Sequence, residues 1–260
     1  MNELSTDRGL QALENCDIFE MYHKLVQSGN YVEFYQYEKK PYSLGTNANR
    51  ARGKRRSCKD ADLLFIRRRD NVYRAKRDFV RLIWANLERT EGPALFTLTH
   101  SGIVGIEEGS KNLNKFIKRL RYEEGQEFRY VAVPEFQKRG SVHFHVLVWG
   151  LDSTKIKSER KERYFAGIWS YGFLDVTQTD GSDKLAGYLA KYMAKSFIDK
   201  RLCQKKAYMA SRNVRRSSSV SNFPRDMLKM IVKKGSKVYQ KDFQTQWLGS
   251  CRYQVYNNDV

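Results

Sequence analysis

SVHFHVLVWG, residues 141–150, is the stretch that decides the fold and the function predicted for this chain. A β-strand sends alternate side chains to opposite faces, so His143 and His145 would project from one face. An otherwise apolar strand has no packing reason to carry two imidazoles there, and paired imidazoles commonly hold a divalent metal. The alternative is two half-buried polar residues on a sheet. The pattern favours a metal or catalytic role.

The chain is strongly basic and rich in aromatic residues. Its 260 residues include 48 Lys and Arg against 29 Asp and Glu, which gives a net charge of +19, and they include 16 Tyr and 14 Phe. Cationic side chains displace counterions from phosphates, and aromatic rings stack on exposed bases. The composition therefore favours a nucleic-acid partner over a small-molecule substrate, although charge alone leaves a membrane surface open.

Two further features bear on location. No apolar run approaches the roughly 18 to 20 residues of a membrane span, and the N-terminus lacks the pattern of a signal peptide. We therefore expect a cytoplasmic protein with no membrane partner. The four cysteines, Cys16, Cys58, Cys203 and Cys251, are isolated from one another, which argues against a local disulfide framework and a CxxC zinc site.

The sequence predicts three segments. Residues 1–90 are expected to be a basic helical N-terminal extension, with helical spacing near residues 18–26, a flexible polar arm near 37–59 and an amphipathic helix over 60–89. Residues 91–198 would form the catalytic core. Residues 199–260 would form a basic C-terminal extension.

Within the core, apolar runs and helical periodicities follow one another in the order β, α, β, β, α, β, α. This is the order of a ferredoxin-like unit. We therefore expect an α+β fold with a central antiparallel sheet and helices on one face.

Glu135 is the predicted third ligand. It ends the strand-like run before the histidines, and the connection QKRG has the length of a hairpin loop. A carboxylate and two imidazoles with open positions suit Mg²⁺ or Mn²⁺, whereas a structural zinc site fills four positions with protein groups. The alternative for Glu135 is a solvated carboxylate beside the turn. His100, which ends the run FTLTH, is expected to be structural.

A reactive group is predicted in DKLAGYLAKYMAKSF, residues 183–197. On a helix, Tyr188, Lys191, Tyr192 and Lys195 fall at i, i+3, i+4 and i+7. The apolar face lies elsewhere, so the core does not need the tyrosines. The lysines favour phenolate and attract phosphate. Tyrosine is a weak nucleophile at its ordinary pKa of about 10, so a metal-activated electrophile beside it would make chemical sense.

FTLTH, PEFQKRGSVHFHVLVWG and GYLAKYMAKSF, in this order, resemble the three motifs of HUH-type rolling-circle replication initiator endonucleases. The resemblance is to bacteriophage and plasmid forms, such as microvirus replication proteins and filamentous phage gene II proteins, and covers roughly residues 92–198. It implies an RRM-like HUH core. It also implies an enzyme that nicks one strand of a DNA origin, stays joined to the 5′ phosphate through tyrosine and later religates the strand.

The resemblance also implies site residues, a cofactor and partners. The implied ligands of Mg²⁺ or Mn²⁺ are Glu135, His143 and His145, and the implied catalytic residues are Tyr188, Tyr192, Lys191 and Lys195. The chain has no G-x-x-x-x-G-K-[ST] loop, so we expect no nucleotide cofactor. A host helicase and polymerase would then act with it on single-stranded and origin DNA.

Basic residues outside the motifs are predicted to contact DNA, and the alternative for each is a solvated charge. They are Arg50, Arg52, Lys54, Arg55, Arg56, Arg139, Arg212, Arg215 and Arg216.

Two other functions stay open at this point. A relaxase or single-strand transposase would use the same site, although relaxases usually place tyrosine before the histidines. A non-catalytic nucleic-acid-binding protein of ferredoxin-like fold would stack bases on sheet aromatics and would bind without cleaving.

Overall fold

The computed structural model describes residues 22–41, 61–87, 92–125, 127–181, 185–190, 199–202, 205–221 and 235–258. The chain divides into two compact units. Unit 1 combines Met1–Arg56 with Arg216–Val260, and unit 2 is Ser57–Arg215. None of the described helices combines the length and apolar character needed to cross a membrane.

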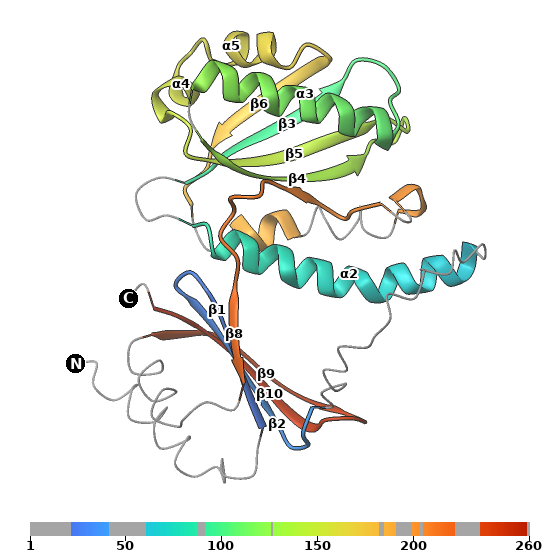
Figure 1. Ribbon diagram of the computed structural model, residues 1–260, viewed down its shortest axis with the longest axis vertical. Coiled ribbons are helices and arrows are strands. Elements are labelled where there is room, and N and C mark those ends of the chain that lie inside the picture. Colours follow the sequence, from blue (N-terminus) through green and yellow to red (C-terminus); the bar gives the residue numbers. More distant parts are fainter. Residues whose placement is uncertain are drawn as a thin grey trace. The chain divides into compact units, whose positions relative to one another are not determined.

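Unit 2 is built on an antiparallel sheet with the strand order β6-β3-β5-β4-β7. The first four strands of this order have the ferredoxin-like arrangement, which confirms the α+β class predicted from the sequence (Figure 1). The strands are β3 (Ala94–His100), β4 (Arg129–Phe136), β5 (Val142–Trp149), β6 (Gly172–Gln178) and β7 (Met209–Ala210).

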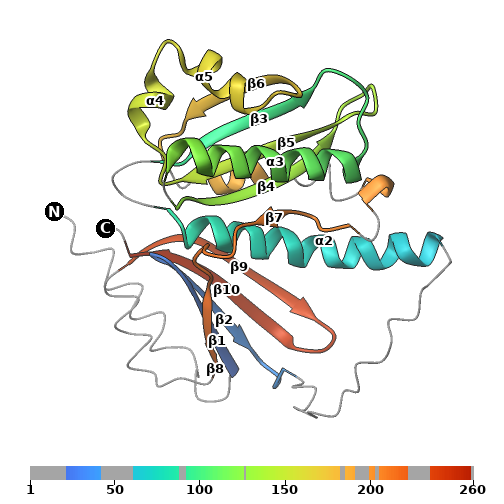
Figure 2. The same cartoon turned by 45° about the horizontal axis from the view of Figure 1, so that its top comes forward.

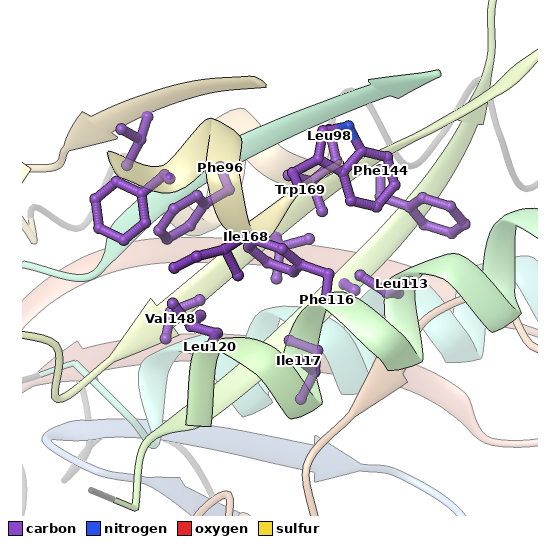
Figure 3. Packing of buried hydrophobic residues seen from close by; sticks show 14 of the residues in the cluster. Phe96, Leu98, Leu113, Phe116, Ile117, Leu120, Phe144, Val148, Ile168 and Trp169 are labelled. Carbon is purple, nitrogen blue, oxygen red and sulfur yellow. The ribbon is translucent and has the colours of Figure 1, made fainter. Parts of the chain in front are cut away.

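One face of this sheet is covered by α3 (Ile106–Glu124), α4 (Ser153–Lys157) and α5 (Lys161–Ile168), as Figure 2 shows. Alternate residues of the strands enter the core on this side because their apolar positions have a period of two. Figure 3 shows this packing. The buried side chains include Phe96, Leu98, Phe116, Leu120, Phe144, Val148 and Trp169.

The opposite face is also covered in part, so the prediction of helices on one face alone is wrong. Helix α2 (Ala61–Trp84) and the helical residues 185–190 pack there. The reason lies in β4 and β5, whose second face is apolar away from the histidines. The buried cluster includes Phe79, Leu82, Ile83, Val131, Val133, Leu147, Trp149, Leu185, Ala186 and Leu189.

Unit 1 contains a second antiparallel sheet, with the order β8-β1-β2-β10-β9. Its strands are β1 (Tyr22–Ser28), β2 (Tyr31–Tyr37), β8 (Ser218–Ser221), β9 (Ser236–Thr245) and β10 (Gly249–Asn257). Tyr35 and Tyr253, on neighbouring strands, both donate hydrogen bonds of 2.9 Å to the buried Glu33 carboxylate.

The helical N-terminal extension is therefore wrong for Tyr22–Tyr37, which forms a β-hairpin. Gly29 adopts a φ of 61° at the hairpin turn, a conformation that glycine reaches without strain. The pairing partners β8 and β10 lie far along the chain, and local spacing does not reveal them. The helix expected over 60–89 is confirmed as α2. The three-segment boundaries remain predictions.

Helix α3 approaches β5 closely at Gly109. This glycine is buried, and a Cβ atom added to it would overlap the Val142 side chain and crowd Phe144. Because Val142 directly precedes His143 on β5, the absence of a side chain at Gly109 helps α3 to brace the histidine strand.

Gly109→Ala tests this contact. Alanine normally favours a helix over glycine by about 1 kcal/mol, but overpacking costs about 1 to 3 kcal/mol. We therefore expect a lower free energy of unfolding, measured by urea denaturation. The matched control is Gly167→Ala in α5, where an added Cβ meets nothing within 4 Å, and it should be neutral or stabilising. Equal effects of both substitutions would contradict the close approach.

Candidate functional site

The pairing of β4 with β5 brings the three predicted ligands together. Glu135 lies across from His143, and Val133 lies across from His145, so Glu135 shares one sheet face with both imidazoles. Glu135 Oε2 lies 3.2 Å from His143 Nε2 and 3.0 Å from His145 Nε2. One ligand atom from each of the three residues lies within 4.8 Å of the others.

Strand β3 supports the site from the other side of β5. Thr97 lies across from His145, and its Oγ1 is 3.4 Å from His145 Nδ1. When Nε2 binds a metal, Nδ1 carries the proton and can donate it to this hydroxyl. Such a contact fixes the tautomer and the ring orientation of a ligating histidine.

The electrostatics favour the metal-binding forms of these groups. Burial lowers the pKa of His145, and the neighbouring His143 lowers it further, which outweighs the opposite effect of Glu135. Burial tends to raise the pKa of Glu135, but hydrogen bonds and charges from His143 and His145 outweigh burial and lower it. A neutral imidazole and an ionised carboxylate are the forms that bind metals.

The cluster fits a divalent cation. Its side chains are 22% (Glu135), 16% (His143) and 13% (His145) exposed, so they are shielded but still reachable from solvent. Within the described ranges it is the one group of three potential ligands this close together. Three protein ligands leave positions open for substrate oxygens, as in catalytic rather than structural sites. Carboxylate and imidazole together suit Mn²⁺ or Mg²⁺.

Tyr188 lies on a helix that packs against the same sheet face. Residues 185–190 bury Leu185, Ala186 and Leu189 in the cluster that contains Leu147 of β5. Tyr188 itself is 49% exposed, which agrees with the prediction that the core does not need it. The other predicted catalytic residues, Lys191, Tyr192 and Lys195, lie outside the described residues.

His100 lies on the other face of the sheet. It is buried, its Nδ1 is 2.9 Å from the Val142 carbonyl oxygen, and its Nε2 is 3.3 Å from Asn112 Nδ2. Its ring contacts Trp169 edge-to-face at 5.0 Å. These contacts connect β3, β5, α3 and the segment after α5, and they place His100 away from the three-residue cluster.

The predicted DNA-binding residues have different positions. Arg139 is exposed in the β4–β5 turn, and its guanidinium donates to the carbonyl oxygens of His100 and Ser101 and to Gln137 Oε1. It thus braces two loops. Arg212, Arg215 and Arg216 are exposed after β7. The remaining five, Arg50, Arg52, Lys54, Arg55 and Arg56, lie outside the described residues.

The site lies within a segment that matches a known family. Residues 93–197 match the replication-associated protein family of ORF2 and gene II proteins. This confirms the family resemblance seen in the motifs and is consistent with a rolling-circle replication initiator. The family match indicates a replication-associated protein that binds DNA. No curated protein and no solved structure matches the chain significantly.

The segment that matches this family contains a supporting residue that the sequence interpretation missed. Thr97 was part of the quoted run FTLTH, but its role depends on which strand lies beside β5. Strict alternation in that run places Thr97 on the face opposite Phe96 and Leu98, and this signal could have pointed to it. The bracing role of Arg139 has no comparable sequence signal.

Mn²⁺ should stabilise the folded chain through this site. At about 100 times its Kd, a ligand of the native state adds about 2.7 kcal/mol, which corresponds to a rise in Tm of roughly 5 to 10 °C. Thermal unfolding with and without Mn²⁺ measures this rise. His143→Ala should remove it, whereas Asp175→Asn, which changes an exposed carboxylate on β6, should keep it. An unchanged rise in His143→Ala would exclude the site.

Thr97→Val should weaken Mn²⁺ binding about 10-fold or more, because it removes the hydroxyl beside His145 Nδ1 and keeps the side-chain shape. Titration calorimetry measures the affinity. Thr177→Val, which alters an exposed threonine on β6, is the matched control and should leave the affinity unchanged. Equal affinities in both variants would mean that Thr97 does not orient the ligand.

Proposed function

We propose that this protein is a replication initiator that nicks one strand of a DNA origin by metal-dependent tyrosine transesterification and later religates it. The observation that carries the proposal is the shared sheet face. Glu135, His143 and His145 meet on the face against which the helix bearing Tyr188 packs. All four residues fall within the segment that matches the replication-associated family.

The chain's residues have the chemistry that this reaction needs. The phenolic oxygen of Tyr188 or Tyr192 attacks the phosphorus in line, and the new O–P bond forms as the bond from phosphorus to the 3′ oxygen breaks. The phenolic proton is lost, and the leaving 3′ oxygen gains a proton. A divalent cation on Glu135, His143 and His145 would polarise the scissile phosphate as a Lewis acid.

The products of this step explain the later stages. One phosphoester bond replaces another, so the strand can be resealed without ATP. The free 3′ hydroxyl can serve as the primer for a host polymerase, with a host helicase opening the duplex in the cytoplasm of a bacterial cell. Two tyrosines one helical turn apart would allow a second attack after one round of synthesis. Lys191 and Lys195 would favour phenolate and hold the phosphate.

The direct test is a covalent protein–DNA adduct. The protein is incubated with Mn²⁺ and 5′- or 3′-labelled single-stranded oligonucleotides tiled across its own replicon, and the products are separated under denaturing conditions. We expect one oligonucleotide to give a protein adduct on its 5′-phosphate fragment and a free 3′-hydroxyl fragment. A complete set of tiles without an adduct would refute the mechanism.

Two variants assign the roles in this reaction. The double substitution of Tyr188 and Tyr192 by phenylalanine should abolish the adduct, and His143→Ala should lower its rate by at least about 100-fold. Both variants should retain most of their salt-sensitive DNA binding, because phosphate contacts supply it. An adduct that persists in the double variant would assign the nucleophile elsewhere.

A further inference from the structure

The sheet face that carries the histidines has a covered half and an open half. Over β4 and β5, residues such as Val133 and Leu147 are buried beneath α2 and residues 185–190. Over β3 and β6 the same face is partly or fully exposed. We call this region the open half-face, and its residues are Thr97, Thr99, Phe173, Asp175 and Thr177.

Phe173 is the large apolar side chain of the open half-face, and it is 76% exposed. Strand register fixes its position, because Phe173 lies across from Thr99, which in turn lies across from His143. Two strand spacings separate Phe173 from His143, a distance of about 10 Å. The ring therefore stands on the same face as the metal ligands, beside the place where a scissile phosphate would lie.

Exposure of one aromatic residue is common and carries no argument by itself. Tyr122 on α3, for example, is 86% exposed, but its helix covers the other face of the sheet. Phe173 differs because its position is tied to the site. Its ring offers no hydrogen bond, so the contact available to it is apolar packing or stacking.

Charge on the open half-face selects a base rather than a phosphate. Asp175 lies two residues from Phe173 on the same strand face and is exposed. Its carboxylate repels the DNA backbone from this part of β6. A strand that enters the site would therefore turn its phosphates away from Asp175 and present a base to the ring.

We propose that Phe173 is a stacking platform for a nucleobase of the single strand that enters the metal site. This inference rests on the proposed function and adds a substrate-positioning residue to it. Stacking tolerates any base because every base has a flat face. Phe173 would thus hold a nucleotide near the scissile phosphate without reading its identity.

The test compares base-bearing with base-free DNA. Fluorescence anisotropy, in EDTA to prevent cleavage, measures the Kd for labelled oligothymidylate of about 20 nucleotides and for the same backbone without bases. Phe173→Ala should weaken oligothymidylate binding about 5- to 150-fold and leave binding of the base-free backbone unchanged. Tyr122→Ala, the matched control, should change neither affinity.

Equal losses for both DNAs, or no loss for oligothymidylate, would overturn the platform. Phe173→Trp provides a second readout, because its indole fluorescence should be quenched by oligothymidylate and not by the base-free backbone. Unquenched fluorescence in the bound complex would also overturn it.

The adduct assay separates this inference from the proposed function. Phe173→Ala should still form the 5′ adduct at saturating DNA, and it should need a higher DNA concentration to do so. Failure of all variants, including the wild type, to form an adduct would refute the nicking function alone. A loss of base-dependent binding in Phe173→Ala would still establish the stacking contact.

Discussion

The antiparallel register of β4 against β5 is the constraint on which the candidate site depends. It places Glu135 across from His143, and His145 follows on the same face, so three ligand atoms from two strands converge. A slip of one residue would send the whole ligand set of one strand to the opposite face. The buried partners of the other face, such as Val142 and Phe144, oppose such a slip because it would expose them.

The same face is divided in a way that suits a reaction on a polymer. Its apolar half anchors residues 185–190, and with them Tyr188, through Leu185, Ala186 and Leu189. Its open half gives a long substrate access from the β6 edge of the sheet. The metal cluster lies between the two, so a nucleophile and a substrate strand can approach the same ligands from different sides.

Much of unit 2 was predictable because its signals are local. Alternation in residues 141–150 correctly assigned the two histidines to one face, and the hairpin-length connection correctly brought Glu135 beside them. What the sequence did not reveal depends on distant pairing. Tyr22–Ser28 forms a strand because β8 and β10 pair around its hairpin, and Thr97 supports His145 because β3 lies beside β5. The second covered face also required knowing which strands are neighbours.

The central claim is that Glu135, His143 and His145 form one divalent-metal site, and pulsed electron paramagnetic resonance of bound Mn²⁺ tests it most directly. The account predicts a single Mn²⁺ per chain, coupled to the nitrogens of two imidazoles, with one coupling lost in His143→Ala and the other lost in His145→Ala. Bound Mn²⁺ without nitrogen coupling, or with couplings that survive both substitutions, would contradict it.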